Sequence, residues 1–112
     1  MNNKYGKVPG DVKAELAKIG SAVQLARKRR NMTQTDMAKL MFVTPRTVVR
    51  LEKGDPGISL SNFLTALYCL QLDFNVSNLF DATHDLIGIG MDVRKHTARA
   101  HVGKKGSPDL DF

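Results

Sequence analysis

Arg46 and Arg50 are two arginines that stand four residues apart, in a segment that opens with Thr44 and Pro45. Residues four apart share one face of a helix, and proline is favoured at the first helical position. An arginine guanidinium can donate two parallel hydrogen bonds to O6 and N7 of a guanine in the major groove of DNA. Residues 44–52 therefore predict a short helix that can read base edges, with Arg46 and Arg50 on its outward face.

Basic residues are concentrated in the first half of the chain. Residues 1–53 hold twelve Lys and Arg against four acidic residues, a net charge of +8. Residues 54–93 hold five Asp and no Lys or Arg, and residues 94–112 hold five basic and two acidic residues. This split predicts a polyanion on one face and a different partner on the other. The four cations at residues 27–30 predict phosphate contacts, although cations also suit a helix C-terminus without any ligand.

The arginines require a scaffold of short helices to hold them. Apolar residues at helical spacing predict a first helix over residues 11–30, with Asp11 as its cap. Thr33 followed by Asp36 is a capping pattern that starts a second, shorter helix. Two short helices joined by a tight turn, the second of them opening with polar and basic residues, form a helix-turn-helix.

Turn residues separate this motif from a fourth helix. Gly54 is expected to end the helix of residues 44–52, and residues 55–57 have the composition of a turn. Ser59 or Ser61 then caps a helix with apolar residues at helical spacing.

The pattern changes after this fourth helix. Leu72, Phe74 and Val76 alternate with polar residues, which predicts a short strand or extended segment. A single strand needs a pairing partner, so a helix through residues 76–80 stays open as the alternative. From Arg94 onward the chain is basic and polar, which predicts disorder.

The composition argues against several protein classes. A chain of 112 residues suits one domain, contains no stretch that could span a membrane, and does not begin like a secretory signal. A single cysteine, Cys69, leaves no disulfide or zinc pattern and favours the reducing cytoplasm. The three histidines lack ligand spacing, and Asp81 and Asp85 have no nucleophile or phosphate cradle beside them. We therefore predict no metal, no cofactor and no enzymatic activity.

Several short motifs resemble the Xre family, whose DNA-binding fold is that of phage Cro and C-type repressors. They are residues 27–34 (RKRRNMTQ), residues 37–38 (MA), residues 43–44 (VT) and residues 50–54 (RLEKG). The resemblance covers about residues 16–72. It implies an all-α, compact five-helix lambda-repressor-like domain that binds double-stranded DNA.

The resemblance also implies a role for individual positions. The residues expected at base edges are Pro45, Arg46, Thr47 and Arg50. The residues expected to contact phosphates are Lys28, Arg29, Thr33, Gln34, Thr44 and Lys53. Arg27 and Glu52 match an internal ion pair of the family. Phe42 stands where the turn of the motif normally has glycine, and a positive φ there would cost on the order of 1 kcal/mol.

A narrower resemblance links the chain to HipB-type antitoxins, which are Xre repressors encoded beside HipA-type Ser/Thr kinase toxins. Residues 54–60 (GDPGISL), 67–72 and 81–90 carry it. It implies a strand after the fourth helix that pairs across a homodimer through Leu72, Phe74 and Val76. It also implies autoregulation of a palindromic operator, and binding and neutralisation of the kinase.

Two alternatives to the antitoxin remain. One is a free-standing Xre regulator with no protein partner. The other is an RNA-binding adaptor, which is disfavoured because no stacking aromatic residues follow the basic segments. For a DNA-binding regulator of either kind, we expect a flexible arm over residues 1–10, a DNA-binding and dimerisation domain over 11–80, and a loop with a disordered tail over 81–112. The expected location is the bacterial cytoplasm, at the nucleoid and away from membranes.

Overall fold

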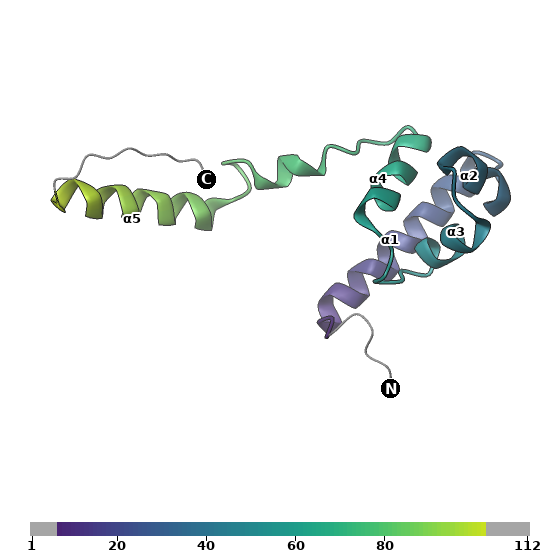
Figure 1. Cartoon of the computed structure of the whole chain (residues 1–112), viewed down its shortest axis with the longest axis horizontal. Helices are drawn as coiled ribbons and strands as arrows, with labels where there is room; N and C mark the ends of the chain where they lie inside the picture. Colours follow the sequence, from purple (N-terminus) through teal and green to yellow (C-terminus); the bar gives the residue numbers. More distant parts are fainter. Residues whose placement is uncertain (1–6, 103–112) are drawn as a thin grey trace. The chain divides into compact units, whose positions relative to one another are not determined.

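The computed structural model describes residues 7–102, and the side chains of residues 7–97. The chain divides into two units, Met1–Phe74 and Asn75–Phe112. The described elements are α1 (Gly10–Arg29), α2 (Gln34–Met41), α3 (Pro45–Glu52), α4 (Leu60–Cys69), the 3-10 helix η1 (Val76–Phe80) and α5 (Leu86–Val102) (Figure 1). This part of the chain contains helices and no strand, as an all-α fold requires. None of the described helices combines the length and hydrophobicity of a membrane span.

The helix starts of the first unit follow local capping chemistry. The Oγ1 atom of Thr33 accepts a hydrogen bond from the N–H of Asp36 at 3.0 Å, and Oδ2 of Asp36 accepts one from the N–H of Thr33 at 2.9 Å. This reciprocal pair confirms the predicted capping box of α2. Ser59, not Ser61, caps α4. The prediction that Asp11 caps α1 is wrong, because α1 begins one residue earlier and Asp11 lies in its first turn.

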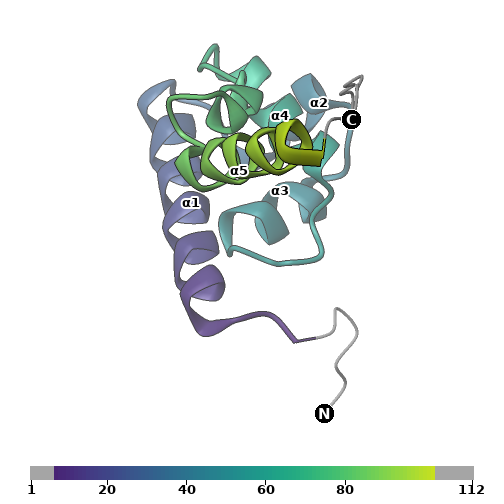
Figure 2. The same cartoon turned by 90° about the vertical axis from the view of Figure 1, so that its left-hand side faces the viewer.

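The core of the first unit is shared by all four helices. α3 packs against α1 and α2, and α4 packs against α2 (Figure 2). The buried apolar residues are Val23, Ala26, Met37, Ala38, Met41, Val48, Leu51, Ala66 and Leu70. Burying a large apolar side chain stabilises a fold by about 1.5–3 kcal/mol. This cluster therefore holds the buried face of α3 against the other helices.

Two glycines let α1 and the end of α3 meet backbone to backbone. A Cβ atom on Gly20 would lie 2.4 Å from the carbonyl oxygen of Glu52, and one on Gly54 would lie 2.7 Å from that of Leu16. Gly54 also has a φ of 76°, the left-handed conformation that ends a helix, as the sequence predicts. Gly20 weakens α1 as an isolated helix, but it allows the close packing that positions α3.

The turn between α2 and α3 keeps its left-handed geometry without glycine. Phe42 has φ 58° and ψ 43°, and its backbone N–H donates to the carbonyl oxygen of Lys39 at 3.3 Å. Its side chain is 94% exposed, so no packing is disturbed. The chain therefore accepts a strain on the order of 1 kcal/mol and retains the helix-turn-helix.

The segment after α4 corrects the expected strand. Residues 72–75 form no regular element, and Val76 begins η1. The N–H of Asn78 donates to the carbonyl oxygen of Asn75 at 3.1 Å, so local bonds replace the ladder that a strand would need from another chain. The strand prediction for Leu72, Phe74 and Val76 is wrong, and the alternative of a helix through residues 76–80 is confirmed.

The second unit is more helical than its composition indicates. Residues 94–102, expected to be disordered, continue α5. Oδ1 of Asp85 accepts from the N–H of Gly88 at 3.0 Å, which caps the start of this helix. None of residues 75–97 is buried, so the helix depends on local bonds. The rest of the expected tail, residues 103–112, and residues 1–6 of the expected arm lie outside the described part.

Candidate nucleic-acid interface

α3 has one buried face and one exposed end. Val48, Leu51 and Glu52 are buried, whereas Pro45 and Arg46 in its first turn are exposed. Among the described residues, Arg46 takes part in no ion pair. The N-terminal turn of α3 therefore presents an unneutralised guanidinium to solvent, which is the requirement for contact with base edges or phosphates.

The entrance to α3 is built by two threonines around Pro45. Thr44 has the extended backbone of an N-cap (φ −79°, ψ 155°) without a capping bond from its side chain. Its Oγ1 lies 3.5 Å from Oγ1 of Thr47, and the backbone N–H of Thr47 donates to its carbonyl oxygen at 3.0 Å. Thr44 and Pro45 are exposed, and Thr47 is half-buried.

A buried ion pair joins α1 to the end of α3. Nε of Arg27 donates to Oε2 of Glu52 at 2.6 Å and its Nη2 donates to Oε1 at 3.0 Å. The two side chains are only 7% and 3% exposed. Nη1 of Arg27 also donates to the carbonyl oxygen of Met32 at 2.8 Å. Hydrogen bonding to Glu52 raises the pKa of Arg27, so the guanidinium stays charged, and its contacts fix α3 against α1 and the α1–α2 loop.

Gln34 extends this ion pair to the start of α2. Its Nε2 donates to Oε1 of Glu52 at 3.1 Å, so one amide N–H is used inside the protein. The amide has a second N–H, which is the donor that a phosphate contact would need. Thr33 is similarly engaged in its capping box and still carries its hydroxyl hydrogen. The structure thus gives both residues a structural partner and leaves their phosphate role a prediction.

Arg50 has a partner that the sequence analysis missed. Its Nε donates to Oδ2 of Asp55 at 2.7 Å, with the two side chains 36% and 24% exposed. The sequence indicated only a turn at this aspartate. A signal was available, because Gly54 predicts that the chain reverses after α3, which returns the following residue toward the last turn of that helix. Arg50 is therefore a braced side chain, unlike Arg46.

The other predicted phosphate contacts are exposed cations at two helix ends. Lys28 and Arg29 lie in the last turn of α1, and Lys53 is the C-cap residue of α3. None of the three takes part in an ion pair among the residues that the structure describes. Nη1 of Arg30 donates to the carbonyl oxygen of Ala26 at 2.7 Å, so one cation of this run does complete the end of its own helix.

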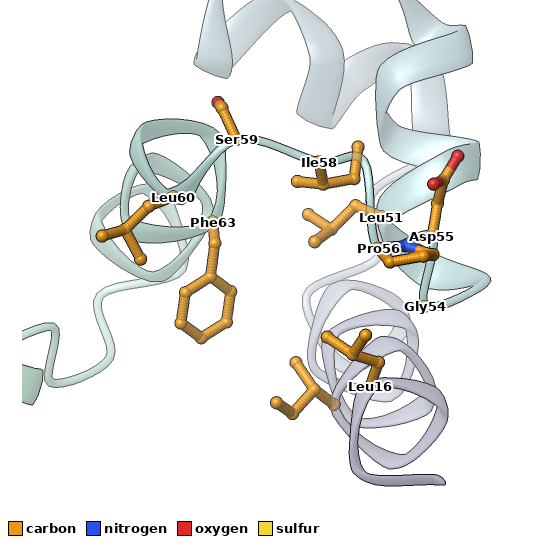
Figure 3. A pocket seen from close by; sticks show the side chains of 10 residues that line it. Leu16, Leu51, Gly54, Asp55, Pro56, Ile58, Ser59, Leu60 and Phe63 are labelled. Carbon is orange, nitrogen blue, oxygen red and sulfur yellow. The ribbon is translucent and has the colours of Figure 1, made fainter. Parts of the chain in front are cut away.

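Two other features of the first unit are an apolar pocket and a cysteine. A pocket of about 280 Å³ is lined mainly by apolar side chains of α1, α3 and α4, with Asp55 as its single titratable residue (Figure 3). Cys69 is half-buried, its Sγ donates to the carbonyl oxygen of Leu40 at 3.5 Å, and burial raises its pKa. No three metal-ligating side chains gather anywhere in the described part of the chain.

Comparison with known families locates the motif within this geometry. The family model for helix-turn-helix domains matches residues 23–66, from the middle of α1 into α4. It includes the ion pair, the capping box, the turn at Phe42 and all of α3. Neither the search of curated proteins nor that of solved structures found a match.

Proposed function

We infer from the match of the helix-turn-helix family model to residues 23–66 that these residues form a domain of the Xre and Cro/C1 type and that the chain is a DNA-binding transcriptional regulator. We propose that it is a repressor which binds a palindromic operator as a homodimer and also serves as the antitoxin of a HipA-type kinase. The observation that carries the DNA-binding part is the contrast within α3. Its inner face is fixed by buried side chains and its first turn exposes Arg46.

Each part of the interface has its own role in this proposal. Arg46 and Arg50 read bases from α3, with Pro45 and Thr47 at its entrance. The phosphates are contacted by Lys28, Arg29, Thr33, Gln34, Thr44 and Lys53. The Arg27–Glu52 pair holds the helix at a fixed angle. Base contacts give specificity, whereas phosphate contacts give register and affinity.

A dimer is required because one helix-turn-helix reads only a few base pairs. Side-chain packing replaces strand pairing in this proposal. Leu72 and Phe74 are 41% and 43% exposed, and the ring of Phe74 meets that of Tyr68 edge to face at 5.8 Å. Leu72 and Phe74 therefore offer exposed apolar side chains that a second copy can cover.

The antitoxin role is supported by the resemblance of residues 54–60 to HipB-type proteins and by the exposed second unit. Leu79, Phe80, Leu86 and Ile87 are each more than 60% exposed, and exposed apolar clusters are typical of protein-binding surfaces. A free-standing regulator would carry the same DNA-binding unit without a kinase partner.

Selection from a pool of randomised duplex DNA tests the DNA-binding part. We expect the wild-type protein to select a two-fold symmetric site. Arg46→Ala should relax the base preference at defined base pairs. Lys28→Ala should weaken binding to all sequences alike and reduce the dependence of the affinity on salt concentration. If Arg46→Ala weakened selected and scrambled DNA equally, Arg46 would not be a base reader.

Two further measurements test the assembly and the partner. Light scattering at micromolar concentration should give the mass of a dimer, and a monomer both free and on DNA would exclude the proposed assembly. Co-expression with a kinase encoded in the adjacent reading frame should restore growth and yield a copurifying complex. Continued growth arrest without a complex would favour the free-standing regulator.

A further inference from the structure

Asp55 is held in place by hydrogen bonds of its side chain and its backbone at the end of α3. Its Oδ2 accepts from Nε of Arg50 at 2.7 Å, and its Oδ1 accepts from the backbone N–H of Gly57 at 2.8 Å. Its own N–H donates to the carbonyl oxygen of Arg50 at 3.1 Å. Figure 3 shows Asp55 at the edge of the apolar pocket, with its carboxylate directed away from Leu16 and Phe63. The carboxylate is therefore a fixed point against which Arg50 rests.

The position of this carboxylate is unfavourable for binding a polyanion. It lies one turn from a proposed base-reading residue, where a negative charge repels phosphates, and near a helix C-terminus, where a cation is preferred. A charge with these disadvantages needs a compensating role. The compensation available here is the restraint of a long side chain that otherwise loses much rotamer freedom on binding.

The chemistry of the guanidinium allows such a restraint without loss of function. Arg50 carries five N–H donors in a planar fork. Nε, on one edge of the fork, donates to Asp55. A guanidinium that meets a carboxylate along this edge still has, at its opposite end, one N–H on each Nη atom, and that geometry matches O6 and N7 of a guanine. One arginine can thus serve a carboxylate and a base at once.

We propose that Asp55 is a positioning residue that fixes the guanidinium of Arg50 for specific base recognition. The inference rests on the base-reading role of Arg50 in the proposed function. Asp55 does not contact DNA in this account. It acts through Arg50, by keeping one rotamer populated before the operator is bound.

The test compares Asp55→Asn with Asp11→Asn, which removes the same charge from an exposed residue in the first turn of α1. The asparagine oxygen can still accept from Gly57 and keep the turn, so the fold should survive. Each variant undergoes selection from randomised duplex DNA, followed by affinity measurements on the wild-type site and on scrambled duplex. Thermal unfolding confirms that each variant is folded.

We expect Asp55→Asn to bind the selected site about three- to tenfold more weakly, the size expected when one arginine side chain must be ordered on binding. Binding to scrambled duplex should be unchanged or tighter, because a negative charge has been removed. The relaxed base positions should be the same ones that Arg50→Ala relaxes. In the Arg50→Ala background, Asp55→Asn should cause no further loss of preference. Asp11→Asn should leave the selected sequence unchanged.

Three results would overturn the inference. Tighter binding to both DNAs would show that Asp55 acts only as a repulsive charge. Tighter binding to the selected site alone would show that Asp55 holds Arg50 away from DNA. Loss of preference at positions that Arg50→Ala leaves intact would assign the effect to another residue. If the wild-type protein selected no sequence at all, the proposed function itself would fail first.

Discussion

The two units of the chain achieve their helical structure in different ways. In residues 7–74, nine apolar side chains and a charged pair are buried, and two left-handed or close-packed glycines fix how the helices meet. In residues 75–97, no side chain is buried, and η1 and α5 are held by hydrogen bonds between near neighbours. The comparison indicates that the first unit determines its own geometry. The apolar residues of the second unit are not buried by other side chains within the described part of that unit.

The largest expected effect is at the buried ion pair of the first unit. Glu52→Ala leaves Arg27 charged and without its partner in the core, which destabilises a fold by about 3–5 kcal/mol. Urea unfolding followed by circular dichroism measures this. Glu15→Ala, at an exposed position of α1, should change stability by about 0.5 kcal/mol or less. Equal stabilities for the two variants would mean that the pair does not brace α3.

The next effect concerns the apolar core. Leu70 is fully buried, so Leu70→Ala removes contacts and leaves a cavity that costs about 2–5 kcal/mol. The expected result is a lower urea midpoint with an unchanged slope. A loss below about 1 kcal/mol would contradict the assignment of Leu70 to the shared core, because truncations at exposed positions have effects of that size.

A smaller effect is expected where local capping acts inside the first unit. Thr33→Ala removes the side-chain acceptor of the capping box and should cost about 1 kcal/mol. Thr33→Ser keeps the hydroxyl oxygen and is the matched control. Both variants are compared by thermal unfolding, and an equal loss in the two would assign the effect to the threonine methyl group instead.

Acidification offers a test that addresses both units. Hydrogen bonds from the backbone and side chain of Thr33 lower the pKa of Asp36, and those from the side chains of Thr83 and His84 lower the pKa of Asp81. A lowered pKa in the folded state stabilises above the ordinary value of 3.8, and the stabilisation is lost as pH falls through the folded pKa. We expect Asp36→Asn to reduce the fall in the free energy of global unfolding as the pH is lowered below 3.8. Asp81→Asn should leave this pH dependence unchanged. An equal effect of both would show that the two units unfold together.

The sequence predicts the first unit well because local chemistry and tertiary packing agree there. A few neighbouring residues are enough to predict each of its main features, which are the Thr33–Asp36 capping box, the end of α3 at Gly54 and the buried face of α3. The contact between Arg50 and Asp55 is different, because it depends on the path of the chain after a left-handed glycine. Gly54 indicates that the chain reverses there, but it does not determine which side chain the carboxylate of Asp55 meets.

The segment that follows α4 and the second unit differ from their predictions because the sequence signals in both are weak and local. The alternation at Leu72, Phe74 and Val76 spans only five residues, and an irregular segment followed by a 3-10 helix satisfies it equally well. The polar composition after Arg94 correctly indicates that little apolar surface can be buried. It does not exclude a helix, because a cap at Asp85 and residues with good helix propensity require no burial.

The smallest expected effect is that of a leucine-to-alanine substitution in the second unit, which matches Leu70→Ala in the first. Leu86 is 72% exposed, so Leu86→Ala should change the unfolding free energy by less than about 0.5 kcal/mol, against the large loss for Leu70→Ala. The same urea titration measures both, at two protein concentrations. A large loss that shrinks on dilution would show that a second copy covers Leu86, because the stability that the wild-type protein gains by association is itself lost as the copies dissociate. A large loss independent of concentration would show that Leu86 is covered within its own chain, which would end the distinction between a self-sufficient first unit and an uncovered second one.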